Sequence, residues 1–218
     1  MSVIAIVGMG PLVGLSVARK WGRKGYKVAM ISRTQSKLDA YATDLKGEGI
    51  EARGYAADVR NAASLNAAFA AIKRDCGAID VLEYSPTEWV PGKSYGPLDT
   101  TVESAIDHFN LLVAGAITSV HAVLPDMVAK GKGAMLFCTG TSAHGPMPFI
   151  TSLAISNAGL RNYVRCLVDE LKPKGIYVGT LSIGVGIQRD GTKNDPDLIV
   201  DRLYEMFEQQ DQTDEIWA

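Results

Sequence analysis

The first twenty-five residues constrain the fold of this chain more than any other stretch. Val3–Val7 is a continuous apolar run, as expected for a strand buried on both faces. The turn Gly8–Gly14 follows directly, and apolar residues then recur at helical spacing with arginine and lysine between them. A strand, a glycine turn and an amphipathic helix in this order predict a dinucleotide-binding unit. Its helix would offer free N–H groups and the positive end of its dipole to phosphates.

The three glycines and the proline of the turn each have a predicted role. Gly8 turns the chain off the strand, and Gly10 lets the backbone approach a pyrophosphate. Gly14 lets the helix pack close to the sheet, and Pro11 suits the first helical turn, where no N–H is needed. The alternative is that these glycines serve a tight turn and nothing more.

Composition narrows the class of protein. The chain has 218 residues, of which 47% are hydrophobic and 21% charged, which predicts one globular domain spanning 1–218. A net charge of −2 argues against nucleic acid or an anionic membrane as the main partner. Cys76, Cys138 and Cys166 lack metal-like spacing, so we expect reduced thiols, no metal site and a cytoplasmic protein. No signal peptide and no membrane-spanning apolar stretch are expected.

Short apolar runs alternate with helical patterns along the whole chain. Strands are predicted at 3–7, 27–31, 50–57, 79–84, 133–138, 175–181 and 215–218. Between them, helices are predicted after the glycine turn and at 36–45, 62–74, 101–127, 150–171 and 195–208, with loops at 85–100 and 139–148. This alternation predicts a single-domain α/β fold: a doubly wound, Rossmann-like parallel sheet with helices on both faces.

Several short motifs lie in order at places that such a fold brings to the strand ends. They are the turn Gly8–Gly14, Asp58-Val59, Ile79-Asp80-Val81-Leu82, Thr139-Gly140-Thr141-Ser142, and Glu170 to Val178. Together they make the chain resemble the short-chain dehydrogenase/reductase family over nearly its whole length. The resemblance implies a nicotinamide dinucleotide lying across the ends of the strands.

The chain departs from the family pattern around the cofactor. Leu12 stands where the family has the middle glycine of its turn, and Gly10 offers a relocated flexible point. Tyr84-Ser85-Pro86-Thr87 replaces the family's Asn-Asn-Ala-Gly. Leu112 aligns with the asparagine of the first long helix, and Asn110 lies two residues earlier.

The largest departure is at the active-site Tyr-x-x-x-Lys, where Leu153 and Asn157 stand in register. Hydride transfer to a carbonyl requires a proton donor for the developing alkoxide. Leu153 cannot donate a proton, and Asn157 can bind a ribose hydroxyl but carries no charge. Ser142 is the best match for the family's substrate-orienting serine.

Two other side chains are candidate proton donors. His144 follows Ser142 in the same loop, although such a histidine is commonly just solvated. Tyr84 lies at a strand end facing the expected cofactor, where it can equally form a lid over the ribose or an aromatic part of the core.

The second predicted strand ends in Ser32-Arg33-Thr34, without the acid that holds the ribose of NAD(H). Arg33 can pair with a 2′-phosphate and stack on adenine, so the cofactor is predicted to be NADP(H) rather than NAD(H) unless Arg33 is merely a surface residue. Asp58 is expected to accept from the adenine amino group, or to cap a turn, with Val59 against the ring. The remaining predicted cofactor contacts are Leu12, Ser32, Thr34, Ser85, Asn157 and Gly184.

The predicted function is that of an NADP(H)-binding oxidoreductase transferring hydride to or from a small carbonyl or alcohol, with a degenerate proton-donor site. The alternative is a non-catalytic NADP(H)-binding or regulatory protein on the same fold. The predicted substrate segment is 184–195. The helices at 101–127 and 150–171 carry more apolar surface than a sheet face covers. The resemblance implies that they pair with further copies, as a homodimer or homotetramer.

Overall fold

The computed structural model describes residues 1–88 and 96–218. Its centre is a sheet of seven parallel strands in the order β3-β2-β1-β4-β5-β6-β7. The strands are β1 (Val3–Val7), β2 (Lys27–Ser32), β3 (Ala52–Ala56), β4 (Val81–Tyr84), β5 (Gly133–Gly140), β6 (Ile176–Ile183) and β7 (Asp214–Trp217). The strand order reverses between β1 and β4, which is where open α/β sheets bind ligands.

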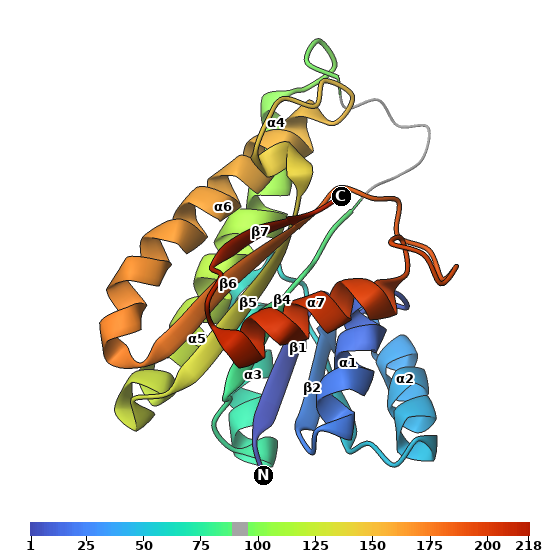
Figure 1. Ribbon diagram of the computed structural model, residues 1–218, viewed down its shortest axis with the longest axis vertical. Coiled ribbons are helices and arrows are strands. Elements are labelled where there is room, and N and C mark those ends of the chain that lie inside the picture. The colour runs from blue at the N-terminus through green and yellow to red at the C-terminus, as the bar shows by residue number, and fades with distance from the viewer. Residues whose placement is uncertain (89–95) are drawn as a thin grey trace.

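Helices cover both faces of this sheet (Figure 1). They are α1 (Val13–Arg23), α2 (Gln35–Gly47), α3 (Ala62–Cys76), α4 (Val102–Phe109), α5 (Gly115–Lys130), α6 (Thr151–Leu171) and α7 (Pro196–Gln209). One hydrophobic cluster joins the sheet to α1, α2 and α7, and a second joins it to α3, α5 and α6. The predicted doubly wound α/β fold is confirmed. Of the predicted loop at 85–100, residues 89–95 lie outside the described residues.

The predicted long helix at 101–127 is wrong in one respect, because its hydrogen-bonding register changes partway. The π-helical turn η1 (Asn110–Ala114) separates α4 from α5. The Tyr84 hydroxyl donates a hydrogen bond to the Leu111 carbonyl within this turn. Gly115 follows, where a Cβ atom would lie 2.4 Å from the Tyr84 hydroxyl oxygen. The helix therefore reorganises where it crosses the end of β4.

The same stretch contradicts the expectation that no apolar stretch is long enough to span a membrane. Val102–Lys130 is a helical segment of 29 residues that is long and apolar enough to cross a membrane, and its most apolar window of 18 residues has a mean hydropathy of 1.7. Half of the apolar window is buried inside the protein, including Val120 and Val123 of α5. Core helices acquire the same composition by packing on a sheet, so this length and hydropathy are weak evidence for a membrane span.

Candidate active site

A cleft of about 570 Å³ opens at the carboxyl ends of the strands. Its walls are the glycine turn and the start of α1, the residues that follow β4, the end of β5, the start of α6 and the segment after β6. Predicted site residues in this lining are Gly8, Gly10, Leu12, Gly14, Ser85, Ser142, Leu153, Asn157 and Gly184. The sheet thus brings together residues that lie up to 176 positions apart in the sequence, from Gly8 to Gly184.

Gly8 is required at its position for two reasons. Its φ is +98°, a conformation that L side chains rarely adopt, and a Cβ there would lie 2.5 Å from Pro86 N. Gly14 is also needed for a close approach, but to Met9 rather than to the sheet, because a Cβ at Gly14 would lie 3.0 Å from the Met9 Cα. Gly10 meets nothing closer than the Gly8 carbonyl oxygen at 3.8 Å, so its backbone is open to a ligand.

The start of α1 differs slightly from the prediction. The helix begins at Val13, so Pro11 precedes the first helical turn instead of occupying it. Leu15 N–H donates to the Gly10 carbonyl, and Ser16 N–H donates to the Leu12 carbonyl. Within residues 1–88 and 96–218, the N–H groups of Val13 and Gly14 have no such partner and remain as donors at the cleft.

A second hollow of about 140 Å³ continues from the cleft past Gly8 and Met9. Ser32, Arg33, Asp58 and Val59 line it, as predicted for the adenosine end of a dinucleotide. Arg33 is exposed and forms no ion pair with any of the described residues. Asp58 Oδ1 accepts from Arg60 N–H at 3.0 Å, so Asp58 does stabilise a turn, while still lining the hollow.

Thr34 is placed differently from the neighbouring Arg33. It is the exposed N-cap residue of α2, its side chain makes no capping hydrogen bond, and it is not part of either hollow's lining. The sequence prediction of a Thr34 contact with the cofactor is therefore not supported by its position.

Ser142, Leu153 and Asn157 converge at the inner end of the cleft. Asn157 Nδ2 donates to Ser142 Oγ at 3.1 Å, and Gly140 N–H donates to Asn157 Oδ1 at 3.3 Å. The Gly140 contact fixes which end of the amide faces Ser142. Ser142 Oγ accepts this hydrogen bond from Asn157, so the Ser142 hydroxyl can donate its proton to another acceptor. Leu153 lies one helical turn before Asn157 on α6 and adds an apolar wall.

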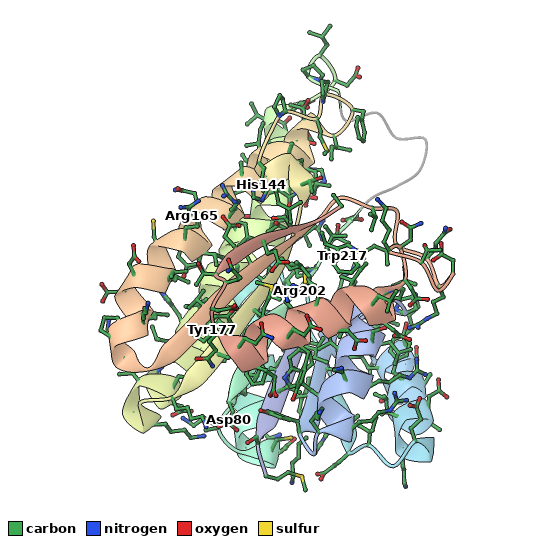
Figure 2. All side chains as sticks on the ribbon, viewed as in Figure 1. Asp80, His144, Arg165, Tyr177, Arg202 and Trp217 are labelled. Carbon is green, nitrogen blue, oxygen red and sulfur yellow. The ribbon has the colours of Figure 1, made fainter. Side chains whose placement is uncertain are left out.

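His144 lies outside this cleft, contrary to the prediction of a proton donor beside Ser142. Its Nε2 is 2.8 Å from Ser182 Oγ and 4.0 Å from a carboxylate oxygen of Asp214. Burial, followed by the positive charge of Arg161, lowers its pKa, so the imidazole is neutral near pH 7. Figure 2 shows His144 and Arg165 on the side of the sheet that α6 covers.

Tyr84 also lies outside the cleft. Its side chain is 0% exposed, packs among the α3 and α5 residues of the core, and is held by its hydrogen bond to the Leu111 carbonyl. The prediction that Tyr84 faces the cofactor is wrong. Successive side chains of β4 point to opposite faces of the sheet, and that of Tyr84 points to the face covered by α3 and α5. Of its two alternative interpretations, the core aromatic is the one observed.

The sequence analysis missed Glu83. This carboxyl group is fully buried in β4, next to Tyr84 but on the opposite face, and neither oxygen has a hydrogen-bond partner among the described residues. The available signal was one acidic residue inside the apolar strand Val81-Leu82-Glu83-Tyr84. Over the described residues, no group of three histidine, cysteine, aspartate or glutamate side chains is placed to hold a metal ion.

Comparison with known proteins gives a consistent result. Residues 2–192 match the family model described as short chain dehydrogenase. The chain is 26% identical over 178 residues to dehydrogenase/reductase SDR family member 4 of Sus scrofa, covering 79% of this chain and 61% of that protein. It is 27% identical over 179 residues to 2,3-dihydro-2,3-dihydroxybenzoate dehydrogenase of Bacillus subtilis, covering 82% of this chain and 67% of that protein.

Among solved structures, one similar fold is an NADPH-bound short chain oxidoreductase from Pseudomonas aeruginosa PAO1, described as containing an atypical catalytic center. The TM-score is 0.88 at 20% identity, covering 99% of this chain and 94% of that one. The chain is shorter than its curated mammalian relatives, of which it spans between 53% and 62%.

Proposed function

The chain belongs to the short-chain dehydrogenase family, and from that premise we propose that it binds NADP(H) and transfers hydride to or from a small carbonyl or alcohol. The observation that carries the proposal is the continuity of the two hollows across the glycine turn. Arg33 stands at one end, and Ser142 with Asn157 stands at the other. That arrangement suits an extended dinucleotide with a phosphate near Arg33 and a reactive ring near Ser142.

The residues present fit such a cofactor. The N–H groups at the start of α1 and the open backbone at Gly10 suit a pyrophosphate. Arg33, exposed at the rim of the smaller hollow, suits a 2′-phosphate through a charge-assisted pair. NADPH, when bound, supplies the hydride. The NADPH in the Pseudomonas structure, at 20% identity, agrees with this choice.

The chain's own residues orient the substrate and exclude water. Asn157 holds Ser142 so that the serine O–H can donate to a substrate carbonyl oxygen. Leu153 and Ile150 present apolar surface beside that hydroxyl. Neither Leu153 nor Asn157 can release a proton, and a positioned general acid contributes about 10²–10⁴-fold to rate. We therefore propose slow turnover by the family's usual proton route.

The experiment is NADPH titration followed by an assay of NADPH oxidation against a panel of aldehydes, ketones and quinones. We expect saturable NADPH binding, tighter than that of NADH, and slow carbonyl-dependent oxidation. Absence of NADPH binding would refute the proposal. The second candidate is a non-catalytic NADP(H)-binding protein, and the residues at positions 153 and 157, Leu153 and Asn157, support it. Binding of NADPH without its oxidation by any carbonyl would favour this candidate.

A further inference from the structure

Glu83 is a buried acid inside β4, two residues before the cleft residue Ser85. It is 0% exposed, and its neighbours in the adjoining strands are Ile6 of β1 and Leu136 of β5, both fully buried. Neither carboxyl oxygen has a partner in ordinary hydrogen-bond geometry among the described residues, although the Ser85 hydroxyl and the Cys138 thiol are near enough to act on the carboxyl group. Burying an unpartnered carboxyl costs stability. A hydrophobic residue would avoid this cost, so the acid calls for an explanation.

The strand register points Glu83 toward two cleft residues. Tyr84 of β4 pairs with Phe137 of β5, and the residues that follow them are Ser85 and Cys138. Ser85 lies two positions after Glu83, and side chains at that spacing share a face. Both Ser85 and Cys138 line the cleft, and Ser85 Oγ is also buried without a partner among the described residues.

The electrostatic surroundings keep Glu83 protonated. Burial raises the pKa of Glu83 to about 8, outweighing the opposite effect of the nearby Ser85 hydroxyl and Cys138 thiol. Burial, and then the Glu83 charge, raise the pKa of Cys138, so the thiol keeps its proton. Among described residues, Cys138 is the one titratable group that acts on Glu83. Glu83 is therefore a neutral carboxylic acid near pH 7, close to Ser85.

We propose that Glu83 is the proton donor of this site and that its proton reaches the cleft through the Ser85 hydroxyl. The proposal rests on the oxidoreductase function proposed above. Hydride addition to a carbonyl carbon leaves an alkoxide. The alkoxide takes the Ser85 hydroxyl proton as Ser85 Oγ takes the proton of Glu83, which leaves an alcohol and a Glu83 carboxylate. Water entering after the alcohol departs returns a proton to Glu83 by the same path.

Glu83→Gln tests this directly, because the amide keeps the shape of the neutral acid but cannot release a proton. We expect unchanged NADPH affinity and a kcat lowered by about 10²–10⁴-fold. The parent kcat should fall above about pH 8 as Glu83 loses its proton, and Glu83→Gln should lack this fall. Ser85→Ala should lower kcat similarly. Cys166→Ala, at an exposed cysteine of α6 that lies outside the cleft lining, should keep the parent kcat. Glu83→Met is the second variant if Glu83→Gln does not fold.

A measurement on the cofactor-free protein complements the kinetics. The infrared carbonyl band of a protonated carboxylic acid should be present at neutral pH in the parent and in Ser85→Ala, and absent from Glu83→Gln. Turnover and a pH profile unchanged in Glu83→Gln would overturn the relay while leaving the oxidoreductase function intact. A parent that binds NADPH but reduces no carbonyl would overturn both.

Discussion

Arg33 is the residue from which we infer a preference for NADP(H) in the proposed cofactor site. Its guanidinium is exposed at the end of β2, beside the smaller hollow, and no acidic residue follows that strand. A guanidinium in this place favours the additional phosphate of NADPH, whereas a carboxylate would favour the free ribose of NADH.

We expect Arg33→Ala to weaken NADPH binding by about tenfold to a hundredfold, the range of a hydrogen bond to a charged group, and to leave NADH binding nearly unchanged. Fluorescence titration of both nucleotides measures this. Arg53→Ala is the matched control, because Arg53 is an exposed arginine on the neighbouring strand β3 that pairs with Asp75 and lies outside the hollow. Equal losses for the two nucleotides would remove Arg33 from this role.

Glu83 also links stability to pH, independently of any cofactor. Its pKa rises from 4.5 to about 8 in the folded protein. Between these values the folded state binds more protons than the unfolded state, so the free energy of unfolding must fall as pH rises. We expect the difference between parent and Glu83→Gln to change by up to about 1.4 kcal/mol per pH unit. Urea unfolding at several pH values between about 5 and 8 measures it; parallel curves would contradict the buried acid.

Single residues also show where sequence reasoning ends. Alternation along β4 places Glu83 and Tyr84 on opposite faces, but a parallel sheet is covered on both faces, so the sequence does not say which one meets the cleft. The partner of His144 was not predicted because Ser182 lies 38 residues away. Ser142, Leu153 and Asn157 were brought together correctly because a family pattern fixes their order and spacing.

Among the elements, α6 carries the two positions at which the sequence analysis predicts a departure from the family pattern. Leu153 and Asn157 are four residues apart, on the same face of α6, and both line the cleft. Asn157 also connects the end of β5 to Ser142 through its two amide atoms. Asn157→Lys alone should therefore loosen Ser142 as well as add a positive charge to the site.

We expect the double change Leu153→Tyr with Asn157→Lys to raise NADPH oxidation above the combined effect of the two single changes, because a phenol needs a nearby ammonium to release its proton readily. In that background Glu83→Gln should have little effect, because the phenol replaces the buried acid. Steady-state assays of parent, singles, double and triple variants test this. A double variant no faster than the singles would show that the missing pair does not limit the rate.

The bounds of the elements were predicted within a few residues because buried strands and amphipathic helices alternate clearly. The turn η1 was not predicted. A π turn changes which backbone N–H and C=O groups pair, but it leaves no distinct mark in the pattern of apolar residues. Its position depends on the Tyr84 hydroxyl and on Gly115, both of which act through contacts across the fold.

On the scale of the whole molecule, α4 and α6 leave apolar surface uncovered. Val102, Ile106 and Phe109 of α4 are 69%, 54% and 48% exposed, and Ile155 of α6 is 55% exposed. The two helices lie side by side at the end of the molecule where α4 extends past the strands (Figure 1). Contiguous exposed apolar surface of this kind is typical of an interface.

We propose that a second copy of the chain covers this surface, since a self-complementary patch closes by a two-fold axis. Light scattering at micromolar concentration should then give at least twice the 23.3 kDa chain mass. Ile106→Glu and Ile155→Glu should each shift the protein toward monomer, because each would bury an unpaired charge in the interface. Val128→Glu is the matched control, an exposed apolar residue of α5 roughly 33 Å along the helical stretch from Ile106.

The same interface bears on the site. Ile155 and Thr151 line a pocket of about 570 Å³ that reaches Ser142 and His144 from outside the cleft. A second copy over α6 would cover this pocket and restrict water beside Ser142, so Ile155→Glu should slow NADPH oxidation as it dissociates the dimer, while Val128→Glu should do neither. A parent that is monomeric at micromolar concentration would contradict the interface, and the apolar residues of α4 would then face solvent.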